Sequence, residues 1–586
     1  MSVAAAPGMT RPRIAPRLFA AMAMAPLLAG CGDADEPSSP EHQLPQVSYL
    51  SPVEHLARAS MALRGMRPAV QELEAVAADP AALGGIVDGY LQSPAFGKVV
   101  RDLHNEALLS RVDYFYYPAG FPAVGALAAA DLYQVNRSLQ EASLRLIEHV
   151  VMNDRPYGEI LTADYYLAND LVAAVWGSLD VTGSDWQVTH WKDDRPKAGI
   201  LSDPWLFTRY QSTQSNKNRG RANALSKALI CYDFLSRDIE IDASINLADP
   251  AVVDDAVVKN PACASCHQAL DPLASYFADY FPIVVPQQFT DYPFRMNFPI
   301  EGGGGFIDFY YPGLGDYYFG EGSLREPSYF GQAAASVTDL GRVMAEDPRF
   351  SLCATKRFYA YLHQIDVDDV ELEAVAGLQE RFIESGLDAK ALAKAVVLDD
   401  SFRISHSDDP VEAEDLVGVL KIRPDQLSSM IDDLTGFRWQ LHPDVALGQV
   451  DLLDDSFVGF QVLGGGIDSA FVTKPAHTFS ATSSLVLEAV AAEAAAFVVA
   501  ADSKVEPGAR RLFSRVDPGG GTEEQIRQQL SWLHARLFAE WVGPVSPEVD
   551  ESYALYASLL EHSGDPARAW EGTLTAMLQD IRIATY

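Results

Sequence analysis

The stretch "KNPACASCHQALDPLASYF", residues 259–277, contains a Cys-x-x-Cys-His motif formed by Cys263, Cys266 and His267. Cysteines at this spacing occur in haem attachment sites, in halves of zinc sites and in redox-active dithiols. A dithiol of the thioredoxin type follows a strand and opens a helix, whereas the preceding segment "DPAVVDDAVVKNP" ends in Asn-Pro, which indicates a loop. The setting therefore disfavours a dithiol.

The other cysteines bear on the choice between zinc and haem. Cys231 and Cys353 lie singly in the chain, far from the motif. Four thiolates could hold a structural zinc ion, but His267 would have no purpose in such a site. In an oxidising compartment the two scattered cysteines are instead a candidate disulfide, although sequence separation does not define their geometry. The motif itself then predicts one covalent c-type haem, bound by thioethers from Cys263 and Cys266 with His267 as an axial iron ligand.

The N-terminal residues predict export. Three arginines precede the apolar segment 18–29, which is shorter than the ~20 residues that span a bilayer, so it is typical of a signal peptide. Residues 28–31, Leu-Ala-Gly-Cys, resemble the bacterial lipobox, in which the cysteine, here Cys31, carries lipid. The polar, Pro-rich segment 31–47 suits a flexible tether. We expect no other segment to be long and apolar enough to cross a membrane, and we expect a lipid-anchored protein of the bacterial cell envelope, in the periplasm or at the cell surface.

The charge of the chain limits its partners. Its 80 acidic and 44 basic residues give a formal net charge of −36. Nucleic acids and acidic lipid surfaces attract Lys and Arg, so the composition argues against both. Two explanations of the acidity stay open: attraction of a soluble, basic redox partner protein, and simple solubility outside the cell.

Apolar periodicity and capping signals predict a mainly α, multi-module protein with minor β-hairpins. In "SPVEHLARASMALRG", Ser51 is an N-cap, Glu54 completes a capping box and Gly65 ends the helix. Helical spacing recurs in the following segments: 138–153, 226–238, 350–365, 486–502 and 523–542. Strand-like sequence is limited to pieces such as 302–320, where glycines separate aromatic residues. A hairpin is expected there, packed on the surface, with closure over the haem edge as the alternative.

Composition shifts divide the chain into six expected parts. The best boundary is the polar stretch "SHSDDPVEAED", residues 405–415. The parts are a signal peptide (1–30), a tether (31–47), a helical domain (48–200), a haem-binding domain (201–404), a linker (405–415) and a C-terminal helical domain (416–586).

The second axial ligand of the iron is less well defined by the sequence. Met or His usually fills this position in electron-transfer proteins, whereas an open position allows ligand binding or peroxide chemistry. Met296 lies in the loop-like segment "DYPFRMNFP" and is the candidate ligand. Met344 has apolar helical spacing and is expected in the core. His190 and His363 are reserve donors.

Three motifs together resemble the secreted proteins of planctomycetes and myxobacteria that carry a planctomycete-type cytochrome c motif among domains of unknown function. They are residues 153–170, the Asp-Pro-Leu at 271–273 after the Cys-x-x-Cys-His motif, and the helix start Asp-Pro-x-Phe at 347–350 with Cys353. The Leu-Thr-Gly helix at 420–436 is also similar, but in the family it usually precedes the haem module. The resemblance implies an exported haem protein and no established activity.

The expected function is one-electron transfer at the cell envelope, because no second catalytic motif is visible. The sequence lacks G-x-S-x-G, H-E-x-x-H and P-loop patterns. Two alternatives stay open. One is a haem-dependent oxidoreductase that uses peroxide or is coupled to a substrate-binding domain, and the other is a non-redox binding protein with structural haem.

Overall fold

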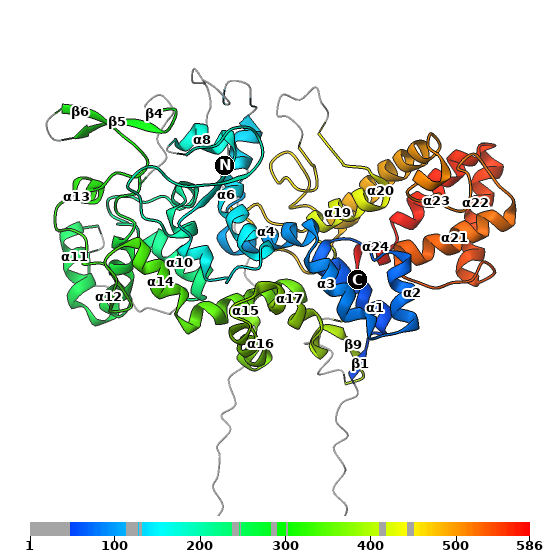
Figure 1. The fold of residues 1–586 in the computed structure, drawn as a ribbon, viewed down its shortest axis with the longest axis horizontal. Helices are drawn as coiled ribbons and strands as arrows, with labels where there is room; N and C mark the ends of the chain where they lie inside the picture. Colours follow the sequence, from blue (N-terminus) through cyan, green and yellow to red (C-terminus); the bar gives the residue numbers. More distant parts are fainter. Residues whose placement is uncertain are drawn as a thin grey trace, which may run out of the picture. The chain divides into compact units, whose positions relative to one another are not determined.

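The computed structural model describes residues 47–586 except 113–126, 128, 129, 131, 178, 237–244, 247, 283–289, 301–302, 410–417 and 442–449. The predicted signal peptide, the lipidation candidate Cys31 and the tether up to residue 46 lie outside the described residues, as does much of the predicted linker. The described chain is mainly helical, as the sequence predicts (Figure 1).

The helices fall into two sequential groups. The first group contains α1 (Pro52–Arg64), α2 (Val70–Ala78), α3 (Ala82–Leu91), α4 (Pro94–Leu108), α6 (Leu132–Met152), α7 (Glu159–Thr162), α8 (Asp170–Trp176), α9 (Pro204–Arg209), α10 (Arg219–Ile230), α11 (Pro250–Lys259), α12 (Pro261–Ser275), α13 (Leu314–Phe319), α14 (Val337–Ala345), α15 (Pro348–His363), α16 (Leu372–Glu384) and α17 (Ala389–Val397). The second group contains α19 (Pro424–Thr435), α20 (Ala481–Asp502), α21 (Glu523–Phe538), α22 (Pro547–Ser563), α23 (Pro566–Leu578) and α24 (Ile581–Ala584). Short 3-10 turns are η1 (Gly199–Ser202), η3 (Val367–Asp369), η4 (Asp400–Arg403) and η5 (Pro507–Ala509).

The described strands are short and pair antiparallel. The pairs are β1 (Val47–Tyr49) with β9 (Ile404–Ser407), β2 (Tyr166–Ala168) with β3 (Gln187–Thr189), and β7 (Ser328–Tyr329) with β8 (Gln332–Ala333); β4 (Thr290–Asp291), β5 (Arg295–Ile300) and β6 (Gly303–Ile307) form a three-stranded sheet. The prediction of a loop around Met296 is therefore wrong. Met296 lies in β5, where its backbone pairs with Thr290 and Ile307, so hydrogen bonds to both neighbouring strands hold this segment extended.

The capping signals at the start of α1 predict its bounds correctly. The Ser51 hydroxyl accepts a hydrogen bond from the Glu54 backbone N–H at 3.3 Å, and the Glu54 carboxylate accepts one from the Ser51 N–H at 2.8 Å. Gly65 ends the helix with a φ of 63°, a conformation that glycine adopts without steric cost. The backbone N–H groups of Ser51 and Glu54, which have no partner within the helix, thus each donate to the other residue's side chain. This is why the helix begins where the sequence indicates.

Two predictions near the motif are wrong. The helix expected over 226–238 is α10, which begins at Arg219 and ends at Ile230. It ends because the Asn223 side chain accepts a hydrogen bond from the Phe234 N–H and donates one to Asp233, which fixes a reversal of the chain. The segment expected to be a loop before the motif is α11, capped by the Asp249 carboxylate.

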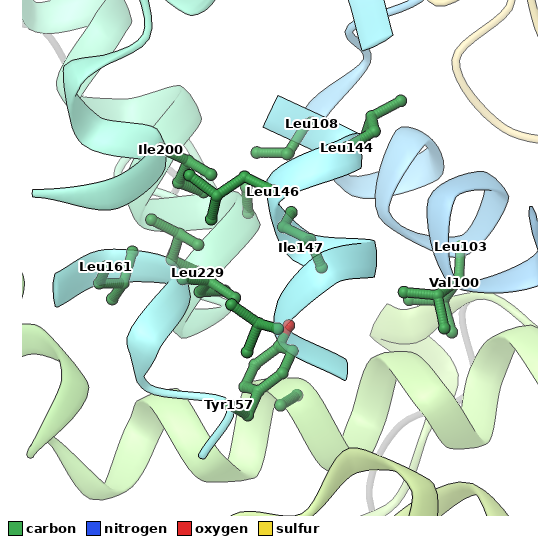
Figure 2. Close-up of a cluster of buried hydrophobic side chains, with 14 of the residues drawn as sticks. Val100, Leu103, Leu108, Leu144, Leu146, Ile147, Tyr157, Leu161, Ile200 and Leu229 are labelled. Carbon is green, nitrogen blue, oxygen red and sulfur yellow. The ribbon is translucent and has the colours of Figure 1, made fainter. Parts of the chain in front are cut away.

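The larger hydrophobic core is built from residues between Leu56 and Leu420, and it takes members from both 48–200 and 201–404. In Figure 2, Val100 and Leu103 of α4 and Leu146 and Ile147 of α6 belong to this cluster, together with Leu229 of α10. The two parts expected as separate domains therefore share one core. Their boundary at residue 200 stays a sequence prediction.

The second hydrophobic core joins Met61 of α1 to residues between Ile422 and Ala584. Its main helices are α20 and α23, which pack against each other, as do α22 and α23 (Figure 1). The change from the first core to the second falls between Leu420 and Ile422, a few residues beyond the predicted linker.

Helix α20 is, among the described residues, long and apolar enough to cross a membrane by length and composition. The expectation that no such segment follows the N-terminal one is wrong for this helix. Its apolar character has a local explanation, because Val490, Ala494 and Val498 are fully buried in the second core. At its end, Asp502 accepts hydrogen bonds from the backbone N–H groups of Leu512 and Phe513. These contacts make one face of α20 part of the second core.

The structure joins Cys231 and Cys353 in a disulfide, with Cα atoms 5.3 Å apart. Cys231 follows the last residue of α10 and Cys353 lies in α15, so the bond links the two helices. Because 122 positions separate the two cysteines, the bond closes a long loop.

The double variant C231S/C353S is expected to lower the free energy of unfolding by about 2–5 kcal/mol, because it releases the entropy of that loop in the unfolded chain. Urea unfolding followed by circular dichroism measures the change. Treatment of the wild-type protein with a thiol reductant is the matched comparison and should give a similar shift. Equal urea midpoints for variant and wild type would contradict the expected role of the bond.

Candidate functional site

Helix α12 carries the Cys-x-x-Cys-His motif in its first two turns. Asn260 caps the helix: its side-chain oxygen accepts hydrogen bonds from the backbone N–H groups of Ala262 at 3.0 Å and Cys263 at 3.4 Å. Pro261 occupies the first helical position, where its missing N–H has no consequence. A helix, α11, directly precedes the motif, so the strand that a thioredoxin-like dithiol requires does not precede it.

The two motif cysteines are free thiols in the structure. Cys263 is half-buried, and Cys266 is buried with its sulfur 4.0 Å from the carbonyl oxygen of Phe234. The alternative of a four-cysteine zinc site does not fit, because Cys231 and Cys353 are bonded to each other. Within the described part of the chain, no group of three or more His, Cys, Asp or Glu residues is arranged to hold a metal ion.

His267 is oriented by a carboxylate one helical turn further along α12. Its Nδ1 lies 2.8 Å from Oδ1 of Asp271. Asp271 in turn accepts two hydrogen bonds from Arg219 of α10, from Nε at 2.7 Å and from Nη2 at 2.9 Å. A carboxylate at this position requires the proton on Nδ1, which leaves the Nε2 lone pair available to a metal. Metal-binding histidines commonly have this arrangement of imidazole and carboxylate.

The same contacts keep Asp271 ionised. Burial acts to raise its pKa, but hydrogen bonds from His267 and Arg219 and the charge of the guanidinium lower the pKa to about 2. The carboxylate is therefore negative at all pH values near neutrality. The sequence identified Asp271 only through the family resemblance, and the structure shows its contact with the motif histidine.

His267 and Leu270 line a cavity of about 670 Å³, a size typical of small-molecule and cofactor sites. Other walls come from α4, from α10 and from the Asp233–Leu235 turn behind the disulfide. Helix α15 and the segment 473–477 of the C-terminal region complete the lining. The cavity is thus enclosed by elements from all three predicted domains. The lining does not include Cys263 or Cys266, which lie on the same helix one turn or less from His267.

The charges around the cavity are largely paired. Lys227 lies 3.3 Å from Asp233, and Lys474 lies 2.9 Å from Asp366. Arg357 differs: its guanidinium donates to the backbone carbonyls of Ala228 and Lys227, and no carboxylate of the described residues lies within ion-pair distance. Burial lowers its pKa from the ordinary value, but the group stays positive near neutral pH.

The reserve donors named from the sequence lie away from this cavity. His190 is exposed, with Nδ1 2.9 Å from the Asp164 carbonyl oxygen. His363 is engaged at both nitrogens, by the Tyr359 carbonyl at 3.0 Å and the Ser401 hydroxyl at 3.3 Å. Met344 is buried in the first core, as expected. Met296 lies on β5, and its role as an iron ligand stays a prediction.

Two cavity residues that the sequence did not single out have buried polar atoms without a hydrogen-bond partner. They are the hydroxyl of Tyr361, in α15, and Nε2 of His477. Burial is the main cause that lowers the pKa of His477, to about 4, and nearby positive charges such as Arg423 act in the same direction. Its ring is neutral near pH 7. No signal in "TKPAHTF" marks His477 as a ligand, and the donors that the sequence indicates all lie before residue 364.

No protein-family model, no curated protein and no solved structure matches the chain.

Proposed function

We propose that the chain is an exported, lipid-anchored c-type haem protein that transfers single electrons at the bacterial cell envelope. The observation that carries the proposal is the His267 imidazole, held by Asp271 at Nδ1 and lining a cavity of about 670 Å³ directly after two free cysteines. The resemblance to exported planctomycete and myxobacterial proteins, through Asp271-Pro272-Leu273, supports the same function.

The donor types of the motif are those of a covalent haem site, while the lining of the cavity beside His267 does not include the two cysteines. Cys263 and Cys266 would form the two thioethers, and His267 would bind the iron through Nε2, because Nδ1 is already bonded to Asp271. Arg357 offers the cavity a half-buried cation without a carboxylate partner among the described residues, which suits a haem propionate. When bound, the haem would supply reversible one-electron chemistry at its iron.

The surface charge supports a role with a soluble partner. A net charge of −36 steers a basic protein toward the molecule and increases its association rate at low ionic strength. The partner proposed from the chemistry is therefore a basic redox protein, and binding to nucleic acid is not part of the proposal.

Expression of the exported chain with c-type haem maturation is expected to give a protein that keeps a haem absorption spectrum after denaturation, because thioethers survive unfolding. The double variant C263A/C266A should lose this covalent haem completely, whereas C231S/C353S should retain it. Visible spectra of oxidised and reduced protein, with and without carbon monoxide, provide the measurement. A wild-type chain without haem would refute the proposed function, and ready carbon monoxide binding would favour the haem-dependent oxidoreductase.

Asp271→Asn is expected to raise the reduction potential by on the order of 60 mV, the one-electron equivalent of a tenfold change in equilibrium. Without the anionic carboxylate, the imidazole donates less electron density and the oxidised iron loses stabilisation. Because the pKa of Asp271 is about 2, the difference between variant and wild type should be constant from about pH 5 to pH 8.

Spectroscopic redox titration measures this shift. Asp254→Asn is the charge-matched control, since it removes an exposed carboxylate of α11 that pairs with Lys217. If Asp254→Asn changes the reduction potential as much as Asp271→Asn does, the cause is the change in net charge and not the hydrogen bond to His267.

Cys31→Ser is expected to release the exported protein from the membrane fraction, because one cysteine would carry the only lipid anchor of the proposal. Fractionation of cells after export, followed by immunoblotting, measures the distribution. Cys31→Ser should leave the haem spectrum unchanged. Full retention of the variant in the membrane fraction would contradict lipid anchoring at this position.

A further inference from the structure

The cavity beside α12 has a mostly apolar wall. It measures about 670 Å³, and neither motif cysteine lines it, so the cavity adjoins the Cys-x-x-Cys-His motif without being built around it. Apolar side chains reach the cavity from α4, α12, α15 and the chain after α15: Leu103, Ala107, Leu270, Ala360, Ile365 and Val367. A cavity of this size and character is typical of a site for a small, largely apolar molecule.

The charged groups of the cavity wall are paired, with one exception. Each lining carboxylate has a basic partner within ion-pair distance, and each lining cation other than Arg357 has an acidic one. The pairs are Glu106 with Arg423 at 3.2 Å, Asp233 with Lys227 at 3.3 Å, Asp366 and Asp368 with Lys474 at 2.9 and 3.5 Å, and Arg219 with Asp271 at 2.7 Å. Arg357 has no such partner in the part of the chain that the structure describes. The wall therefore carries one positive charge that no direct contact balances.

The guanidinium of Arg357 is held in place and keeps one nitrogen free. Its Nε donates to the carbonyl of Ala228 at 2.8 Å and its Nη2 to that of Lys227 at 2.7 Å, both in the last turn of α10. Arg357 lies one turn after Cys353, whose disulfide with Cys231 ties α15 to the end of α10. Nη1 is an accessible atom that donates to none of the described residues. An anion could therefore bind Arg357 without displacing a protein partner, and the donor needs little reorganisation.

We propose that this cavity binds a free amphipathic carboxylic acid, with the carboxylate at Arg357 and the apolar body against α4, α12 and α15. The carboxylate would accept a charge-assisted hydrogen bond from Nη1, and burial of the apolar body would remove it from water. A haem propionate offers the same chemistry, a carboxylate on an apolar body. The absence of both motif cysteines from the lining favours the free acid, and the inference needs no haem.

Isothermal titration calorimetry of the full exported chain with sodium octanoate tests this inference. Octan-1-ol is the matched probe, because it has the same chain length and no charge. Wild type is expected to bind octanoate at least about tenfold more tightly than octan-1-ol, since a hydrogen bond to a charged group adds to the apolar contacts that both probes make. Equal affinity for the two probes would overturn the assignment of a carboxylate to this site.

Arg357→Gln is expected to weaken octanoate binding roughly 10- to 100-fold and to change octan-1-ol binding less than about twofold. Lys394→Gln is the charge-matched control, because Lys394 lies on α17, pairs with Asp88 and does not line the cavity. This control should bind both probes as wild type does. A folded Arg357→Gln variant with wild-type affinity for octanoate would overturn the proposal.

Ala107→Phe tests the apolar part of the site from α4, and it decides the question if Arg357→Gln does not accumulate. The larger side chain should fill part of the cavity and abolish the binding of both probes. Binding of both probes at wild-type affinity by Ala107→Phe would place them elsewhere and overturn the proposal.

The variant C263A/C266A separates the two sources of the carboxylate. It should bind octanoate as tightly as wild type that carries haem. Binding by C263A/C266A but not by haem-bearing wild type would show that a haem propionate occupies Arg357, and would overturn the assignment to a free acid. Absence of octanoate binding in both proteins would also overturn it. The visible haem spectrum of the same samples tests the proposed function separately.

Discussion

The carboxylate of Asp271 is the point on which the site depends, because it connects α10 to α12 and orients His267 at the same time. Arg219 binds it through two parallel hydrogen bonds, and the histidine uses one of the same oxygens. Charge-assisted hydrogen bonds of this kind are about twice as strong as neutral ones and are directional. The imidazole therefore has a fixed tautomer and a fixed ring plane before any ligand binds, so little reorganisation is required of it.

A second connection, the disulfide between Cys231 and Cys353, joins the end of α10 to α15. It fixes the turn that contains Asp233 and Leu235, both of which line the cavity, and the same turn places Phe234 against Cys266. Helices α10, α12 and α15 are thus joined by one covalent bond and one ionic network. Packing in the first core alone would hold the helices together, but these two links define the space between them.

Much of the local structure could be predicted from the sequence, because its causes are local. Ser51 and Glu54 satisfy each other's backbone groups, so their spacing was sufficient to place α1. The end of α10 could not be predicted, since it depends on Asn223 reaching a residue eleven positions away. The motif at Cys263 could be identified from the sequence because its residues are close together in the chain, as those of the α1 cap are. The place of His477 at the cavity could not be predicted, because it is set by tertiary contacts of Ala476 with Gly465 and Lys421.

The arrangement of the cavity walls along the chain has a consequence for assembly. On the proposed function the chain is exported from its N-terminus, so α12 would emerge before the segment 473–477, which lines the same cavity. On the proposed function, the maturation machinery meets Cys263 and Cys266 while one wall of the pocket has not yet been translocated. Covalent attachment would then precede the completion of this wall in the order of translocation, and residues 473–477 would cover the cavity only after a cofactor is bound.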